Sequence, residues 1–295
     1  MMSIFERSAT RLKRLSRIEC VVCDLDGTLL RSDNSIGEQT ISSVSSAIES
    51  GIRVVLASGR TDGFTRAYAK LIGSDAPIVS LNGALVLDSD GNTLHASILP
   101  ASLRVLVEKL RRDGMSARFS VFTESGIFLD ADESHLPRYL RGTSYEIHHL
   151  TSVNAIFDQA VLLLFSGSYI DIQKCSVAIS RRYLGRLQRI MYQSNVGGDH
   201  YYLEVRNGGV SKATGLRTVL QHLGIARTAT ASIGDYTNDI EMCKFTGVSA
   251  AMRNAVEELK AVTDVVTLRS NQNDGVAEFL ELILARKASR SQGTP

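Results

Sequence analysis

The feature that most constrains this chain is an alternation of short apolar runs with helix-length amphipathic stretches at both ends of the sequence but not in its middle. In the first part it predicts strands at 18–23, 52–57 and 77–81, and helices at 36–50 and 61–72. In the last part it predicts helices at 211–223 and 275–285, and strands at 230–233, 248–251 and 264–267. Such an alternation is typical of a parallel sheet with crossover helices. We therefore expect an α/β fold with a Rossmann-like, doubly wound sheet.

The middle of the chain follows a different pattern. Short strands are expected to pair across turn signals, at 85–87 with 93–97 and at 119–122 with 126–129, with helices at 101–113 and 169–184. This pattern predicts an α+β unit inserted into the α/β domain. The expected division is a core domain at 1–84 with an N-terminal extension at 1–16, an inserted unit at 85–199, and the rest of the core at 200–295 with a frayed tail from about 287. The chain should cross between domains near Gly83 and Gly197-Gly198.

The composition excludes several classes of protein. Of 295 residues, 44% are hydrophobic and 22% are charged, as in ordinary globular proteins. The 33 basic and 31 acidic residues leave a net charge of +2 without a basic stripe, so nucleic acid is not an expected partner. No apolar run reaches the roughly 18 to 20 residues of a membrane span. We expect no membrane contact, and a monomer or a homodimer.

The N-terminus and the cysteines favour the cytoplasm. The N-terminus is basic but lacks the apolar stretch of a secretory signal. Its arginines could line the amphipathic helix of an organelle-transit segment, an alternative that Glu6 and the short length disfavour. Cys20 and Cys23 have C-x-x-C spacing, but an odd separation on a strand points them to opposite faces, and no second pair completes a zinc site. We interpret them as small core residues.

Two carboxylates follow the first predicted strand, in Asp24-Leu25-Asp26-Gly27-Thr28. Ligands of an open parallel sheet bind at the carboxyl ends of its strands. Residues two apart on an extended chain point to the same side, so Asp24 and Asp26 should face one crevice. One of them can then serve as an ionised nucleophile and the other as a general acid.

Polar residues also stand at other predicted strand ends and at one helix start. They are Ser58-Gly59-Arg60, Asn82-Gly83, Gly234-Asp235-Tyr236-Thr237-Asn238-Asp239 and Lys212. Loops that converge on one crevice are typical of an active site in this fold class. Plainer interpretations stay open: Arg60 could pair with a surface acid, and Asp235 or Asp239 could only cap a helix.

The charges at these positions predict a metal ion. A phosphomonoester carries roughly two negative charges near pH 7. Asp24, Asp235 and Asp239 add to that charge, against the single positive charge of Lys212. Like charges so close repel or force protonation. An oxygen-only ligand set suits magnesium, which one or two carboxylates and a substrate phosphate usually hold.

These motifs together resemble the haloacid dehalogenase (HAD) superfamily, and within it the Cof-type phosphatases, over residues 18–284. The first to fourth family motifs are matched by Asp24 to Thr28, Ser58-Gly59-Arg60, Lys212, and Gly234 to Asp239. The long stretch between Gly83 and Lys212 is similar to the second type of cap domain in this family, which is found in sugar-phosphate phosphatases. The stretch at 251–255 is also similar to the family, except that Arg253 stands where a small residue is common.

The resemblance implies roles for individual residues. Asp24 would attack phosphorus, and Asp26 would protonate the leaving oxygen and later activate water. Contacts to phosphate or substrate are implied for Thr28, Ser58, Gly59, Asn82, Lys212 and Asn238. Mg²⁺ ligands are implied at Asp24, at the backbone carbonyl of Asp26, and at Asp235, with Asp239 close by.

We therefore expect a magnesium-dependent phosphatase for small phosphorylated metabolites. Hexose phosphates are the first candidates, and phosphorylated cofactors such as flavin or pyridoxal compounds are the second. Two alternatives stay open. One is a phosphotransferase or mutase with the same nucleophile, and the other is a phospho-accepting regulatory module, which also combines an acidic cluster with a Thr or Ser and a Lys.

Overall fold

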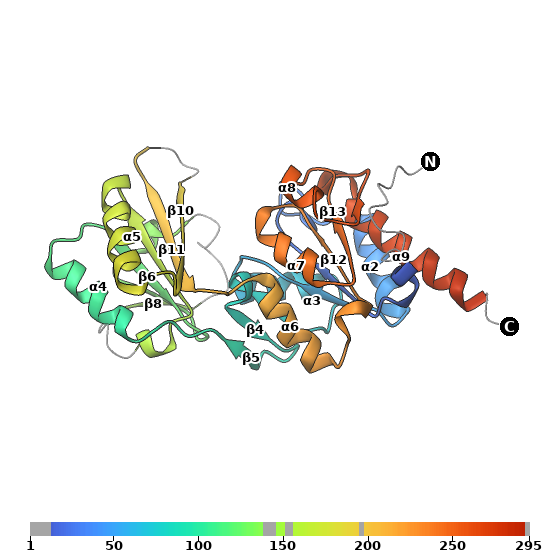
Figure 1. Cartoon of the computed structure of the whole chain (residues 1–295), viewed down its shortest axis with the longest axis horizontal. Coiled ribbons are helices and arrows are strands. Elements are labelled where there is room, and N and C mark those ends of the chain that lie inside the picture. The colour runs from blue at the N-terminus through green and yellow to red at the C-terminus, as the bar shows by residue number, and fades with distance from the viewer. Residues whose placement is uncertain (1–12, 138–145, 151–155, 195–197, 293–295) are drawn as a thin grey trace. The chain divides into compact units, whose positions relative to one another are not determined.

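The computed structural model describes residues 13–137, 146–150, 156–194 and 198–292, and the chain forms two compact units (Figure 1). The core unit is Met1–Leu94 with Ser211–Pro295, and the inserted unit is His95–Val210. Both divisions fall later in the chain than the predicted ones after residues 84 and 199. The reason is that the 85–96 hairpin extends a sheet of the core unit, whereas the strand at 201–207 pairs within the inserted unit. Gly197, at the second predicted crossing, lies outside the described residues.

The core unit contains a five-stranded sheet in the order β14-β13-β12-β1-β2, and every neighbouring pair in it is parallel. A parallel bridge between Ala57 and Val79 brings in β3, which pairs antiparallel with β4 in a second sheet of order β3-β4-β5. All residues of β1 are buried, so both faces of this inner strand are covered. This arrangement confirms the predicted α/β class.

The strands of the core unit are β1 (Cys20–Cys23), β2 (Arg53–Leu56), β3 (Ile78–Ser80), β4 (Leu85–Leu87), β12 (Thr230–Gly234), β13 (Val248–Ala251) and β14 (Val265–Val266), together with β5 (Thr93–Ala96), which pairs in its sheet and runs across the boundary between the units. Its α-helices are α2 (Glu38–Glu49), α3 (Asp62–Leu71), α6 (Lys212–Leu223), α7 (Ile240–Phe245), α8 (Glu257–Lys260) and α9 (Gly275–Gln292). Its 3₁₀ turns are η1 (Lys13–Arg17), η2 (Leu81–Gly83), η6 (Arg227–Ala229), η7 (Thr237–Asp239) and η8 (Asn271–Asn273).

Apolar side chains attach these helices to the sheet. Cys20 and Val22 lie in one buried cluster with Leu216 of α6 and Met242 of α7. The helices α2 and α9 pack against each other. The helix α9 continues to Gln292, where a frayed tail had been expected from residue 287, because no glycine or proline interrupts it before residue 293. The Lys287 ammonium also donates to the Ser50 carbonyl at 3.0 Å.

The inserted unit is built on a six-stranded sheet of order β10-β11-β9-β6-β7-β8, in which β7 and β8 are parallel and the other neighbours are antiparallel. Its elements are α4 (Ser102–Arg112), β6 (Arg118–Phe122), β7 (Ile127–Leu129), η3 (Glu133–His135), β8 (Ile147–His149), η5 (Phe157–Gln159), β9 (Leu162–Gly167), α5 (Tyr169–Tyr183), β10 (Leu187–Gln193) and β11 (Tyr201–Asn207). An apolar cluster joins the sheet to α4 and α5, with Phe119, Phe165 and Leu203 from strands and Val107 and Ile179 from helices. In the described part of the chain, no helix combines the length and the apolarity that crossing a membrane requires.

Candidate active site

The loop that carries Asp24 and Asp26 leaves the sheet at the end of β1, the strand between β12 and β2. The Asp24 N–H donates to the Ile233 carbonyl at 3.1 Å, which keeps the loop in register with β12. Gly27 turns the loop with a φ of +77°, and a Cβ at this position would lie 2.2 Å from Asp235 Oδ2. Only glycine therefore lets the two loops approach this closely.

Lys212 links the carboxylates across the site. It is fully buried at the start of α6, whose first turn is closed by a capping box between Ser211 and Thr214. Its ammonium donates to Asp24 Oδ1, and to Asp239 Oδ1 at 2.7 Å. Burial alone would lower the pKa of Lys212, but the charges of Asp239 and Asp24 outweigh it and raise that pKa. The lysine is therefore a fixed positive charge beside the predicted nucleophile.

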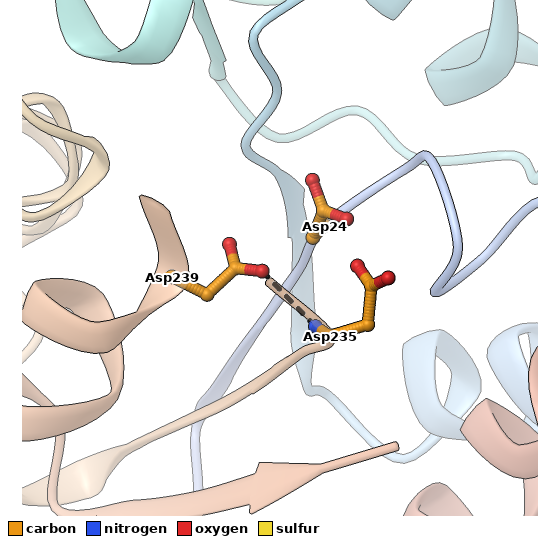
Figure 2. A group of neighbouring side chains, drawn as sticks. All are labelled: Asp24, Asp235 and Asp239. Carbon is orange, nitrogen blue, oxygen red and sulfur yellow. Dashed lines mark hydrogen bonds between the residues drawn. The ribbon is translucent and has the colours of Figure 1, made fainter. Parts of the chain in front are cut away.

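Asp24, Asp235 and Asp239 form one acidic cluster, in which an oxygen of each lies within 4.8 Å of an oxygen of the others (Figure 2). Asp235 follows β12, and Asp239 ends η7 just before α7. Both oxygens of Asp239 accept protein hydrogen bonds: Oδ1 accepts from Lys212, and Oδ2 accepts the N–H groups of Asp235 and Tyr236 at 3.0 and 3.1 Å. Asp235 Oδ1 accepts the Thr28 hydroxyl at 3.1 Å. The hydrogen bonds among the described residues place a donor on Oδ1 of Asp24 and on Oδ1 of Asp235, and the second oxygen of each carboxylate lies in the cluster.

The electrostatics of this cluster fit a hard cation. Burial raises the pKa of Asp24 well above its usual value, although Lys212 opposes that rise. Burial, and then the charge of Asp239, raise the pKa of Asp235 to about 6. One lysine therefore does not fully compensate these carboxylates, and a divalent cation beside Asp24 and Asp235 would lower both pKa values. The atoms that could bind the cation are carboxylate oxygens, the ligands that magnesium prefers.

A second group of predicted residues lies where β2 and β3 end. The Ser58 N–H donates to the Val79 carbonyl and the Asn82 N–H donates to the Ser58 carbonyl, both at 2.8 Å. A Cβ on Gly59 would lie 2.9 Å from Asn82 Nδ2, so this contact also needs glycine. Asn238 donates to Asn82 Oδ1 at 2.9 Å, which joins this group to the loop after β12. The Ser58 hydroxyl accepts the Arg60 N–H at 3.0 Å and keeps its own hydrogen for another acceptor.

Two residues outside the predicted set contact the site. The surface acid that Arg60 pairs with is Asp26 itself, with Nε to Oδ2 at 2.9 Å and Nη2 to Oδ1 at 2.5 Å. Asn254 donates to the Gly27 carbonyl at 2.8 Å and so supports the turn beside Asp235. The likeness of the 251–255 stretch to the family was the one sequence signal that could have singled out Asn254.

An α/β sheet with an inserted unit, and with carboxylates gathered around a buried lysine at its strand ends, is typical of two-unit α/β enzymes with an acidic site. The profile of the haloacid dehalogenase-like hydrolases matches residues 21–280, and the chain belongs to this family. The family, the Cof-type subfamily and the hydrolase class predicted from the sequence are thereby confirmed.

Several relatives are similar over nearly their whole length. The 5-amino-6-(5-phospho-D-ribitylamino)uracil phosphatase of Bacillus subtilis is 26% identical, over 88% of this chain and 96% of the relative. An HMP-PP phosphatase of Escherichia fergusonii is 26% identical, over 87% of this chain and 92% of the relative. A haloacid dehalogenase-like hydrolase of Bacteroides thetaiotaomicron superposes with a TM-score of 0.77 at 27% identity, over 90% of this chain and 99% of that one.

Proposed function

We propose that this protein is a magnesium-dependent phosphatase that hydrolyses small phosphomonoesters through an aspartyl-phosphate on Asp24. Within its family it is a phosphoric monoester hydrolase. One observation carries the finer proposal: the Lys212 ammonium is buried between Asp24 and Asp239, next to Asp235, at the carboxyl end of a parallel sheet. This arrangement combines a fixed nucleophile with the positive charge that an incoming phosphate needs.

The proposed reaction has two steps. In the first, an Asp24 oxygen forms a bond to phosphorus, the bond from phosphorus to the ester oxygen breaks, and Asp26 gives its proton to that oxygen. In the second, water attacks phosphorus, Asp26 takes the proton from this water, and the bond between phosphorus and Asp24 breaks. Asp24 is thus regenerated and inorganic phosphate is released. Lys212 keeps Asp24 oriented and offsets the negative charge that gathers there.

We propose Asp24, Asp235 and the main-chain carbonyl of Asp26 as the groups that would hold magnesium. When bound, the ion would neutralise phosphoryl oxygens and so favour attack by a carboxylate. We assign Asp239 a place close to the ion, supporting its ligands, because both of its oxygens already accept hydrogen bonds from the protein. Ser58 and Asn82, with Thr28, Gly59 and Asn238, are proposed to contact the phosphoryl group or substrate.

The proposed substrates are small phosphorylated metabolites. By its name, the Bacillus subtilis relative acts on a phosphorylated compound that carries a uracil ring, and the Escherichia fergusonii relative acts on HMP-PP. Ring-bearing phosphates therefore belong in the test beside the hexose phosphates that the sequence favoured. The four cysteines are free and buried, which fits a reducing compartment, and we place the protein in the cytoplasm. A monomer or a homodimer stays a prediction, which analytical ultracentrifugation would test.

The direct test is phosphate release from hexose phosphates, ring-bearing phosphates, nucleotides and p-nitrophenyl phosphate, with magnesium or EDTA. Asp24→Asn should abolish turnover, while the matched control Asp75→Asn, an exposed carboxylate paired with Arg53, should leave it unchanged. Quenched turnover should also place a phosphoryl group on the peptide that contains Asp24, which mass spectrometry detects.

Other outcomes would favour the alternatives. Turnover that survives in Asp24→Asn would refute the nucleophile. Phosphoryl transfer to an added alcohol in place of water would indicate a phosphotransferase. A phosphorylated Asp24 that persists without turnover would indicate a regulatory module.

A further inference from the structure

The carboxylate of Asp26 is far less enclosed than that of Asp24. Its side chain is 50% exposed, whereas the side chain of Asp24 is 7% exposed. An exposed aspartate can rotate among several staggered conformers. The orientation of its carboxylate therefore depends on the groups that contact the carboxylate itself.

Arg60 holds that carboxylate with a two-pronged contact. Its Nε donates to one oxygen of Asp26 at 2.9 Å, and its Nη2 donates to the other at 2.5 Å. Two parallel bonds from a planar guanidinium fix both the distance and the rotation of a carboxylate, which a single ammonium cannot do. Each Asp26 oxygen still has a lone pair left for another partner.

Arg60 is itself held from two sides. Its backbone is pinned, because its N–H donates to the Ser58 hydroxyl at 3.0 Å and its carbonyl accepts from Leu81 at 2.9 Å. Its guanidinium lies 4.2 Å from the centre of the Phe64 ring, and its side chain is only 15% exposed. Such a cation–π contact is strongest where water is excluded.

The support continues along α3. The Phe64 and Tyr68 rings are 4.8 Å apart, and the Tyr68 hydroxyl donates to the Asn34 carbonyl at 2.8 Å. Phe64 and Tyr68 are four residues apart on one face of this helix, and Arg60, just before the helix begins, reaches the Phe64 ring. We call these three residues the Arg60 ladder. It ends on the loop that follows Asp26 in the chain.

We propose that Arg60 is a positioning residue that holds the Asp26 carboxylate in its working place, with Phe64 and Tyr68 as its support. This proposal rests on the proposed function, in which Asp26 exchanges protons with the leaving oxygen and with water. Positioned proton transfer contributes about 10²- to 10⁴-fold to such a rate. A variant that keeps the Asp26 carboxylate but no longer holds it in place should lose part of this rate enhancement.

The test compares Arg60→Ala and Arg60→Lys with wild type in phosphate release at saturating magnesium. Arg60→Ala should lower kcat about 10- to 100-fold with KM changed less than about threefold, because the interaction acts on the reacting groups and not on substrate binding. Arg60→Lys should recover only part of the loss, since lysine keeps the charge without the fork. The matched control is Arg53→Gln, which breaks an exposed contact of one guanidinium nitrogen with both oxygens of Asp75, and it should leave kcat unchanged.

A double-mutant cycle with Asp26→Asn tests whether Arg60 affects kcat through the Asp26 carboxylate. If Arg60 acts only through the Asp26 carboxylate, Arg60→Ala should cost nothing further in the Asp26→Asn background. An equal loss in both backgrounds would overturn the proposal, as would a loss confined to KM. If Arg60→Ala does not fold, Phe64→Leu is used in the same cycle, and it should give a smaller, kcat-only loss that also disappears in Asp26→Asn.

The two proposals can fail separately. If wild type releases no phosphate, or Asp24→Asn keeps its turnover, the proposed function fails before Arg60 is examined. If wild type is active and Asp26→Asn is impaired while Arg60→Ala keeps full kcat, the chemistry stands and the positioning role of Arg60 is refuted.

Discussion

The two units fill their interiors with different chemistry. Buried residues of the core unit include the charged side chains of Asp24, Asp239 and Lys212. The cluster beneath the helices of the inserted unit is apolar, with Phe119 near Phe157 and Phe165 at ring distances of 6.3 Å. The acidic site of the core unit therefore depends on charge compensation, and the apolar cluster of the inserted unit, which does not include the buried Arg206, depends on filled volume. Substitutions should therefore destabilise the acidic site by leaving charges unpaired, and the apolar cluster by removing packed volume.

The largest effect that would test this contrast is expected from Lys212→Met. It removes the only positive partner that the described contacts give to Asp24 and Asp239, and it leaves two buried carboxylates without compensation. Such a change costs about 3–5 kcal/mol and should also abolish turnover. Hydrogen exchange of the β1 and β12 amides, measured in EDTA, should report the loss in the core unit.

Two further variants make that measurement specific. Lys260→Met removes a lysine paired with the exposed Glu257, and it should change stability by less than about 0.5 kcal/mol. Lys212→Met combined with Asp239→Asn should recover part of the loss, because one uncompensated charge is gone. Unchanged exchange in Lys212→Met would break the contrast between the units.

A smaller effect is expected from Gly27→Ala, which concerns close approach instead of charge. Both Gly27 and Gly51 have positive φ, at +77° and +81°, but only a Cβ on Gly27 would meet a neighbour, the Asp235 carboxylate. Displacing that carboxylate should raise the magnesium concentration for half-maximal activity about tenfold, as loss of a supporting contact does at metal sites. Gly51→Ala should leave it unchanged, and equal values for the two variants would contradict the proposed ligand role of Asp235.

The sequence predicted the core unit well because its signals are local. An apolar strand followed by Asp24 and Asp26, or by Ser58, can be recognised without knowing what packs against it. The strand ends then meet because neighbouring parallel strands end at one edge of the sheet. The individual roles of these residues remain predictions, but their proximity follows from the sheet.

What the sequence could not supply was pairing over long distances. Arg60 and Asp26 are 34 positions apart, and they meet because β1 and β2 align Cys23 with Leu56. In the inserted unit, the order of six strands depends on contacts such as β9 with β6 and β11, which no turn signal marks. Hairpins such as β6–β7 were predictable because their turn is local.

Ile179→Val tests how much the stability of the inserted unit depends on the packed volume of its apolar cluster. Ile179 is completely buried on α5 within the apolar cluster. Loss of one methyl group should cost about 0.5–1.5 kcal/mol, visible as faster exchange of the β9 amides. Val177→Ala, at an exposed position of the same helix, should have a smaller effect. Turnover should be unchanged in both, and a large loss of kcat in Ile179→Val would show that the two interiors are coupled.

The smallest expected effect uses one aspartate from each unit, with opposite pKa shifts. The Asn92 side chain, followed by backbone N–H groups, lowers the pKa of Asp88 in the turn between β4 and β5. Burial raises the pKa of Asp130 after β7, although the Phe119 N–H, which donates to it at 3.0 Å, opposes the rise. In an unfolded chain both would titrate at about 3.9.

The signs of the two contributions follow from these directions. The contribution of Asp88 is present above the unfolded pKa and is lost as pH falls through its lowered folded pKa. The contribution of Asp130 is present below the unfolded pKa and is lost as pH rises through its raised folded pKa. Below about pH 5, down through the lowered folded pKa, the stability of wild type relative to Asp88→Asn should therefore increase with pH. Above about pH 3, up through the raised folded pKa, the stability of wild type relative to Asp130→Asn should decrease with pH. Urea denaturation of the three proteins measures both slopes. Slopes of the same sign would mean that burial does not set the direction of the Asp130 pKa shift, and that this partly buried carboxylate is compensated as the core-unit carboxylates are.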